Sequence, residues 1–202
     1  MEILDQSFYL RDGLSVAKDL IGKILVREYE RKTYRYKIVE TEAYMGPEDK
    51  ASHAYGGKLT PRTKPMFDEG GITYIYLIYG MYYCLNIVAE KKEIPHAVLI
   101  RALEPIDQES IEFAARNRNI KSKKIYDLTN GPGKLCKALS IDKALNEIAV
   151  TKKNPLYIED AVAKHDIVSA KRINISYAQE YEHMPWRFYI EDSPYVSVVE
   201  RK

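Results

Sequence analysis

The 202-residue chain is long enough to bury one substantial hydrophobic core, and no linker rich in proline, glycine or serine divides it. Hydrophobic residues make up 46% and charged residues 30%, and no apolar run reaches the roughly 20 residues that cross a bilayer. These values exclude a disordered or membrane-spanning chain, and a formal net charge of +2 neither supports nor excludes DNA binding. We therefore expect one domain over residues 1–202 and, because the first residues lack a secretory signal pattern, a cytoplasmic location.

The first third of the chain predicts a helix, two paired strands and a long loop. Asp12 is placed to cap a helix over residues 14–21. Residues 23–30 and 33–41 then alternate between apolar and polar side chains, as paired strands do. In residues 46–71 glycine and proline interrupt any periodicity, and loops of this length are uncommon and often functional.

Residues 74–86, YIYLIYGMYYCLN, hold five of the 17 tyrosines and predict a β-hairpin that turns at Tyr79 and Gly80. For any single tyrosine here, packing in the core is as good an explanation as a functional role. A hairpin tip is usually exposed, however, so Tyr79 is a candidate wedge or stacking surface for a nucleic-acid base. The core positions expected in this hairpin are Ile75, Leu77, Cys84 and Leu85.

The second half of the chain predicts short strands mixed with two helices. The expected strands cover residues 97–103, 156–159, 167–175 and 187–190, and the expected helices cover about residues 106–116 and residues 134–139. Strands with segregated helices indicate the α+β class. We expect a single compact domain with a largely antiparallel, curved sheet, flanking helices and a protruding β-hairpin.

Two carboxylates and a tyrosine share one face of the strand that enters the long loop. Alternation places Glu40, Glu42 and Tyr44 together. A solvated strand face is the commoner explanation for any one glutamate, but strand ends that feed long loops often carry functional sites. His53 follows in the loop as a candidate acid, ligand donor or ordinary loop histidine.

Motifs for metals, nucleotides and covalent acyl transfer are missing from the sequence. Cys84 and Cys136 lie in apolar runs without a second cysteine or histidine at ligand spacing, so we expect buried free thiols and no metal. No phosphate-binding P-loop, dinucleotide fingerprint or nucleophile elbow is present, so we expect no cofactor.

Two basic groups are candidates for contact with a polyanion, although most such runs are solvated surface. One comprises Lys58, Arg62 and Lys64, and the other comprises Arg116, Arg118, Lys121, Lys123 and Lys124. The segment 130–134, NGPGK, is either a plain helix start or a helix N-terminus where Lys134 and free amides receive a phosphate.

Several separate blocks, in the same order, resemble the alkyladenine (3-methyladenine) DNA glycosylase family. Near the middle of the chain the match includes VETEAY at residues 39–44 and LIRALEP at residues 99–105. The other matching positions are residues 46–49, His53, residues 60–62, 66–67, 76–86, 131–136, 187–189, 193–194 and 196–199.

The resemblance implies a base-excision-repair enzyme that flips a purine out of duplex DNA and hydrolyses its N-glycosidic bond with an activated water. It implies that Glu42 is the catalytic base, and that Arg101 and the main-chain carbonyl of Ile173 help to hold the water. The walls of the pocket would be Tyr44, His53 and Tyr76, and the DNA contacts would include Tyr79, Met81, Arg62 and Lys134.

The resemblance also implies a substrate, namely double-stranded DNA with alkylated or deaminated purines, and Asn86 matches the residue that clashes with the 2-amino group of guanine. We expect a monomer. Tyr55 stands where animal members carry an arginine, which leaves the grip on DNA and the lesion range open. Two alternatives remain, a catalytically inactive module that binds lesions and a bifunctional glycosylase with a lysine nucleophile.

Overall fold

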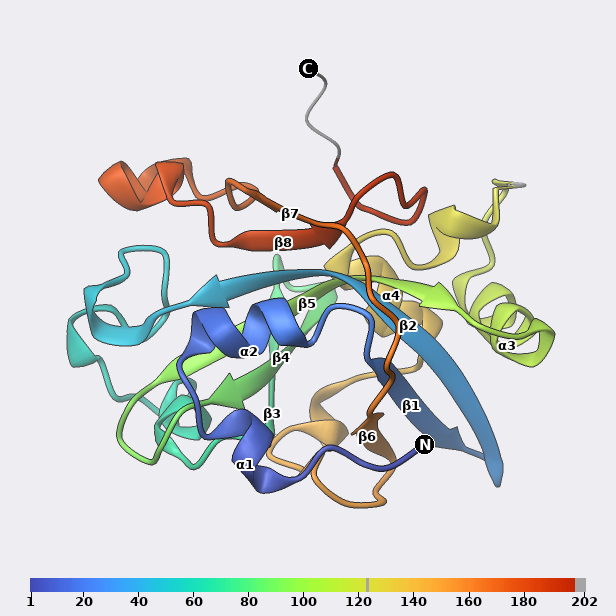
Figure 1. Ribbon diagram of the computed structural model, residues 1–202, viewed down its shortest axis with the longest axis horizontal. Helices are drawn as coiled ribbons and strands as arrows, with labels where there is room; N and C mark the ends of the chain where they lie inside the picture. Colours follow the sequence, from blue (N-terminus) through green and yellow to red (C-terminus); the bar gives the residue numbers. More distant parts are fainter. Residues whose placement is uncertain (123, 199–202) are drawn as a thin grey trace.

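A curled antiparallel sheet of eight strands runs through the middle of the molecule (Figure 1). The computed structural model describes residues 1–122 and 124–198, so Lys123 and Val199 of the sequence analysis lie outside the described residues. Six strands follow the order β3-β4-β5-β2-β1-β6, and β8 pairs with both β2 and β7. The strands are β1 (Ile24–Tyr29), β2 (Lys32–Tyr44), β3 (Thr73–Ile78), β4 (Tyr82–Ala89), β5 (His96–Pro105), β6 (Leu156–Glu159), β7 (Ile167–Ala170) and β8 (Arg187–Ile190).

The longest strand, β2, is the point where the sheet branches. One edge of β2 pairs with β5, whereas the other edge pairs first with β1 over residues 32–37 and then with β8 over residues 40–42. Register shifts against β5 occur on both sides of Glu40 and mark a bulge, which bends a strand locally. Because β8 covers residues 40–42, this part of β2 lies in the interior.

The helices are short, and their ends follow the capping residues in the sequence. They are α1 (Gln6–Tyr9), α2 (Gly13–Asp19), α3 (Gln108–Arg118) and α4 (Pro132–Ala138). The Asp12 carboxylate caps α2 as predicted, accepting hydrogen bonds from the amides of Leu14 and Ser15. Asp107 caps α3 in the same way, so α3 starts two residues later than predicted.

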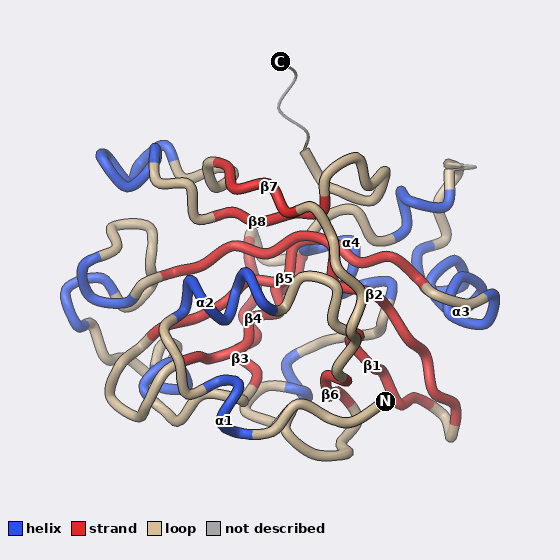
Figure 2. The backbone as a smooth tube through the Cα atoms, viewed as in Figure 1, coloured by secondary structure: helices blue, strands red, loops and turns tan. Residues whose placement is uncertain are grey.

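Three turns of the long loop and three further short elements are 3-10 helices, and the sequence pattern predicted none of these (Figure 2). The long loop contains η1 (Gly46–Glu48), η2 (Tyr55–Gly57) and η3 (Lys64–Phe67). Outside it lie η4 (Ile125–Leu128), η5 (Lys143–Leu145) and η6 (Ser176–His183). Five of them have three or four residues, too few to show a helical period, and η6 is interrupted by a kink at Gln179, which explains why periodicity alone missed them.

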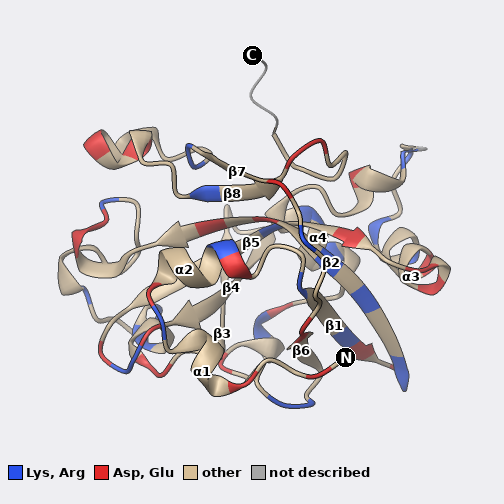
Figure 3. Ribbon diagram, viewed as in Figure 1, with Lys and Arg blue, Asp and Glu red and all other residues tan. Residues whose placement is uncertain are grey.

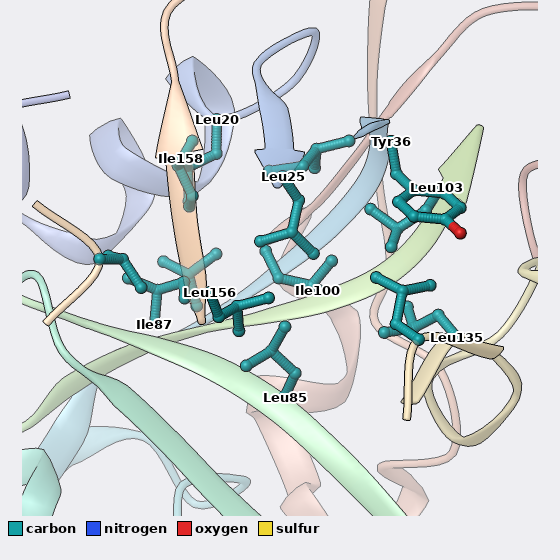
Figure 4. Packing of buried hydrophobic residues seen from close by; sticks show 14 of the residues in the cluster. Leu20, Leu25, Tyr36, Leu85, Ile87, Ile100, Leu103, Leu135, Leu156 and Ile158 are labelled. Atoms are coloured by element: carbon teal, nitrogen blue, oxygen red, sulfur yellow. The ribbon is translucent and has the colours of Figure 1, made fainter. Parts of the chain in front are cut away.

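The main core packs aliphatic side chains of the sheet against α2 and α4 (Figure 4). Leu25 of β1, Leu85 of β4 and Ile100 of β5 meet in this core with Leu20 after α2 and Leu135 of α4, and all five are completely buried. Cys84 and Cys136 are buried free thiols, as predicted. Burying large aliphatic side chains stabilises the fold by roughly 1.5 to 3 kcal/mol each.

Two sequence predictions about the sheet are wrong. Leu77 is not a core residue, because 45% of it is exposed; it lies in the part of the β3–β4 hairpin that extends beyond the pairing of β4 with β5. The strand expected over residues 167–175 ends at Ala170. Beyond it the chain turns, Arg172 binds Asp49 instead of a strand partner, and Asn174 has a positive φ of 58°.

The predicted fold class, a single compact α+β domain with a curved antiparallel sheet, is confirmed. The boundaries 1–202 for that domain stay a prediction. Over the described residues, no helix has both the length and the apolar character needed to cross a bilayer.

Candidate active site

A cavity of about 330 Å³ opens between the β3–β4 hairpin, β5, the long loop and the segment that follows β7. Its volume is within the range of small-molecule sites, roughly 300 to 1,000 Å³. The cavity brings together seven of the residues predicted for the site, namely Tyr44, His53, Tyr76, Tyr79, Asn86, Arg101 and Ile173.

Glu42, the predicted base, lies immediately behind this wall and is completely buried. Its carboxylate accepts hydrogen bonds from the hydroxyl of Tyr44 (2.8 Å) and the amide of Ile173 (2.7 Å). Arg101 approaches the same carboxylate, with Nη1 3.4 Å from Oε1. All three partners line the cavity, so any group that reaches Glu42 from the cavity passes between them.

Glu40 and Glu42 are on one side of β2, as the alternation predicted, because both bind Arg101. The explanation of a solvated strand face is wrong, since neither carboxylate has any exposed surface. Glu40 also accepts a hydrogen bond from Nη1 of the buried Arg187 at 3.0 Å. Two guanidinium groups thus balance two carboxylates, which is the condition under which buried charges are tolerated.

Arg101 keeps its charge in this setting. Burial by itself lowers the pKa of a guanidinium group, but the carboxylates of Glu42 and Glu40 outweigh it and raise the pKa of Arg101 above its ordinary value. The cavity wall therefore presents a fixed positive charge next to Glu42.

One aromatic wall comes from the long loop and β3. The His53 ring lies edge-on against the Tyr76 ring, with ring centroids 4.6 Å apart. The Arg62 guanidinium lies over the same Tyr76 ring, 4.9 Å from its centroid. His53 Nδ1 is 2.8 Å from the Tyr74 hydroxyl, and Nε2 is 3.4 Å from Arg62 Nη2. Because arginine can only donate, Nε2 accepts and Nδ1 carries the proton.

His53 is neutral at physiological pH. Burial, helped by the positive charge of Arg62, lowers the pKa of His53 to about 4. A neutral imidazole whose nitrogens are both engaged has a fixed orientation, which suits a wall that holds a flat ring better than it suits a proton donor.

A buried ion pair supports the part of the cavity wall at Tyr44. Arg172 binds both carboxylate oxygens of Asp49, at 2.6 Å and 2.9 Å, and neither side chain is exposed. Its guanidinium lies 4.8 Å from the Tyr44 ring and 4.9 Å from the Trp186 ring, in cation–π contact. Burial and the neighbouring Glu42 carboxylate raise the pKa of Tyr44 well above its usual value, so its hydroxyl keeps its proton.

The hairpin tip carries the exposed wedge candidate. Tyr79 is 81% exposed and Met81 is 66% exposed, as expected for a tip. Tyr79 and Gly80 both have positive φ values, 53° and 68°, which is the geometry of a type I′ turn. A bulky residue is unusual at the first of these positions, and such strain is concentrated at functional sites.

Asn86 and Lys134 also take fixed places around the cavity. The Asn86 amide is buried on β4 and donates to the carbonyl oxygen of Tyr74 at 3.1 Å. Lys134 does not line the cavity; its amino group donates to Asn130, while the neighbouring Pro132 and Gly133 form part of the rim.

Sequence reasoning missed several residues of the cavity wall. Asn174, Ile175 and Tyr177 line it; the first two fell within the incorrect extension of the strand past Ala170, and Tyr177 follows directly after it. The only available signal was a tyrosine shortly after Asn174 and Ser176. Met66 and Tyr74 also line the cavity, the first from within a block that matches the family. Among the described residues no group of histidine, cysteine or carboxylate side chains could hold a metal ion.

An aromatic cavity backed by a buried, hydrogen-bonded carboxylate and a fixed arginine has the shape and chemistry of an enzyme site for a flat ring system. Comparison with known proteins gives the family. The family model for methylpurine-DNA glycosylases matches residues 7–194. The chain therefore belongs to the methylpurine-DNA glycosylase family, and the resemblance stated from the sequence is confirmed.

Curated relatives extend the match over nearly the whole chain, and each carries the name "Putative 3-methyladenine DNA glycosylase". The chain is 51% identical to the one from Clostridium botulinum (strain Alaska E43 / Type E3), over 96% of this chain and 98% of that protein. It is 50% identical to the one from Desulfitobacterium hafniense (strain Y51), over 98% and 100%. The predicted enzyme class, a monofunctional DNA glycosylase acting in base excision repair, is confirmed.

Proposed function

We propose that this enzyme removes alkylated and deaminated purines, 3-methyladenine among them, from double-stranded DNA by hydrolysing the N-glycosidic bond and leaving an abasic site. The observation that carries the proposal is the position of Glu42, which lies behind three cavity residues and binds all of them. The family and the names of the relatives support the substrate class.

The damaged nucleotide must leave the duplex before the cavity can receive it, at a cost of a few kcal/mol. The exposed Tyr79 would fill the gap that the nucleotide leaves. Stacking of the extruded purine between Tyr44 on one side and His53 and Tyr76 on the other contributes roughly 1 to 3 kcal/mol, which is similar to the cost of flipping. Because the two amounts nearly cancel, small differences between bases decide which one is held.

Hydrolysis needs a water molecule activated next to C1′ of the flipped nucleotide. A carboxylate has about four acceptor positions, and the described residues fill two on Oε1 of Glu42 and one on Oε2. The free position on Oε2 is where Glu42 would accept a proton from the water. Arg101 and the main-chain carbonyl of Ile173 would orient that water, as the resemblance implies.

Lesion classes should differ in the help that they need. A purine alkylated at N3 or N7 carries a positive charge and leaves readily, whereas hypoxanthine or ethenoadenine is neutral and needs protonation as it leaves. Asn86 would exclude guanine, because its buried amide is held by the Tyr74 carbonyl and cannot move away from a 2-amino group.

The test is excision from a duplex with a single hypoxanthine or 7-methylguanine, followed by cleavage of abasic sites with hot alkali. We expect Glu42→Gln, which keeps the shape of the side chain, to lower the rate at least roughly 100-fold, the size of a general-base contribution. Glu48→Gln is the matched control, because Glu48 is an exposed carboxylate in the adjoining loop and should excise normally. Full activity in Glu42→Gln would show that another group performs the hydrolysis.

The two alternatives give different results in the same system. An inactive module would bind the lesion duplex without releasing a base. A lysine nucleophile would form an imine that borohydride converts to a covalent protein–DNA adduct. No lysine lines the cavity in the part of the chain that the structure describes, so we expect no adduct.

The remaining expectations follow from this activity. The enzyme would act as a monomer, without metal or cofactor, in the cytoplasm or nucleoid where the DNA lies. Contacts to the duplex would come from Tyr79 and Met81 at the hairpin tip and from Arg62 and Lys134 beside the cavity.

A further inference from the structure

The end of the described chain reaches the buried charge cluster. The backbone amide of Ser197 donates to Glu40 Oε2 at 2.7 Å, and its hydroxyl accepts a hydrogen bond from Arg101 Nη2 at 3.1 Å. The carbonyl of Val198 accepts from Arg187 Nη1 at 2.8 Å. We refer to residues 196–198 as the C-terminal brace.

The brace completes the set of contacts around Arg101. Nε donates to Glu40 at 3.2 Å, Nη1 lies 3.4 Å from Glu42, and Nη2 donates to Ser197. A guanidinium group is planar with its donors in a rigid fork, so three partners on three nitrogens fix its orientation. Without Ser197 the group keeps its charge partners but can rotate about the remaining contacts.

The brace is held in place independently of these hydrogen bonds. Val196 is buried in a small apolar cluster with Ala170 of β7 and Tyr189 of β8. The Ser197 hydroxyl is also not needed to balance charge, because Glu40 and Glu42 already match Arg101 and Arg187. The Ser197 hydroxyl therefore contributes mainly to the orientation of the Arg101 guanidinium, an effect that can be measured separately from the stability of the fold.

We propose that Ser197 is a positioning residue for base excision, and that its hydroxyl holds Arg101 in the orientation in which Arg101 contacts Glu42. The proposal rests on the proposed function, in which Glu42 and Arg101 act on the attacking water. It follows that the hydroxyl sets the rate of hydrolysis and not the affinity for the lesion, because Ser197 is absent from the cavity wall among the described residues.

The experiment compares Ser197→Ala, Ser197→Thr and the control Ser193→Ala in the full chain. Ser193 lies in the same segment, and its hydroxyl accepts only a local hydrogen bond from the amide of Tyr195 among the described residues. For each variant, single-turnover excision of hypoxanthine, the Kd for a duplex with a non-cleavable lesion and the unfolding midpoint are measured.

We expect Ser197→Ala to excise roughly tenfold more slowly, the effect of losing one hydrogen bond to a charged group, with Kd unchanged and the unfolding midpoint lowered by no more than the loss of that one hydrogen bond. Ser197→Thr keeps a hydroxyl and should restore the rate to within about threefold of the unmodified enzyme. Ser193→Ala should match the unmodified enzyme in all three measurements.

An unchanged rate in Ser197→Ala overturns the inference, provided that Glu42→Gln is inactive in parallel. Equal losses of rate, affinity and stability in both Ser197 variants overturn it as well, because they indicate a structural role only. If Glu42→Gln is itself active, the proposed function fails instead, so the two failures can be told apart.

Discussion

Two glutamates that are two residues apart in β2 have different tasks because their partners differ. Glu42 is bound by Tyr44 and Ile173, which both line the cavity, whereas Glu40 is bound by Arg187 and by the amide of Ser197, away from it. Glu40 therefore organises the charge cluster, whereas Glu42 lies against the wall of the cavity.

His53 makes stability depend on pH in a direction that can be worked out. Its pKa is about 4 in the folded state against an ordinary value of 6.5, so the unfolded chain binds the proton more tightly. The stabilisation is complete above pH 6.5 and is lost as the pH falls toward 4. Between pH 7.5 and pH 5 we expect the free energy of unfolding to fall by about 2 kcal/mol from this group.

Urea unfolding at the two pH values, with His53→Asn beside the unmodified chain, checks this expectation. The variant lacks the ionisable ring. Between pH 7.5 and pH 5 its free energy of unfolding should therefore fall by about 2 kcal/mol less than that of the unmodified chain. His183→Asn provides the control, because His183 is exposed and its removal should leave the pH dependence as it is. Parallel curves for His53→Asn and the unmodified chain would contradict a buried, neutral His53.

At the scale of elements, the β3–β4 hairpin combines a structural half and an exposed half. Asn86 to Ala89 of β4 pair with β5 and lie in the interior, whereas Leu77, Tyr79, Met81 and Tyr82 are exposed beyond that pairing. Next to the turn, Gly133 of α4 packs on Tyr82: a Cβ at Gly133 would lie only 3.1 Å from the Tyr82 side chain. This close contact supports the hairpin from one side and leaves its tip free.

Tyr79→Asn separates the backbone strain at the hairpin tip from the proposed role of Tyr79 as a wedge in the DNA. Asparagine before glycine is favoured in a type I′ turn, so the exchange should stabilise the hairpin by about 1 kcal/mol. It also removes the wedge, so excision from a fully paired duplex should fall at least roughly tenfold. Thermal unfolding measures the expected gain in stability, and single-turnover excision measures the expected loss of rate.

Tyr79→Phe is the companion variant, because it keeps both the strain and the wedge. It should excise at nearly the normal rate without a gain in stability. If Tyr79→Asn excises normally, the tip does not help to flip the base.

The elements most accurately predicted from the sequence were those with local signals. Asp12 and the alternation in β2 define α2, β1 and β2 within a few residues, and Tyr79-Gly80 defines the hairpin turn. Leu77 was misplaced because alternation shows which residues share a face but not how far a hairpin extends beyond its sheet. The short 3-10 helices and the turn after Ala170 depend on tertiary contacts such as that between Arg172 and Asp49.

At the scale of the whole molecule, the candidate site likewise depends on tertiary contacts that local sequence patterns do not predict. The resemblance identified Glu42, Arg101 and the aromatic walls, and the cavity gathers most of them. The partners that hold these groups come from β2, β5, β8 and the C-terminal brace, and they meet only because β2 changes its neighbour from β1 to β8. No local pattern encodes that branch, so the roles of Arg187 and Ser197 could not be predicted from the residues alone.

The charge of the whole molecule bears on how it binds undamaged DNA. Figure 3 shows basic and acidic residues distributed over most of the fold, in keeping with the net charge of +2. The basic groups of the long loop and of α3 lie toward opposite ends of the long axis in Figure 1, so they do not form one patch. A small number of cations near the cavity should therefore provide the electrostatic grip.

We expect the affinity for undamaged duplex DNA to depend only modestly on salt. If Arg62, Lys134, Lys58 and Lys64 each neutralise one phosphate, log K against log salt has a slope of about −3.6. Lys58→Ala and Lys64→Ala should each reduce the magnitude of that slope by about 1. Lys32→Ala should leave it unchanged, because Lys32 is exposed at the β1–β2 turn, at the opposite end of the molecule from the long loop. Fluorescence anisotropy at about 50 to 200 mM salt measures the slope. If the slope shrinks equally in all three variants, the net charge of the molecule attracts the DNA without specific phosphate contacts.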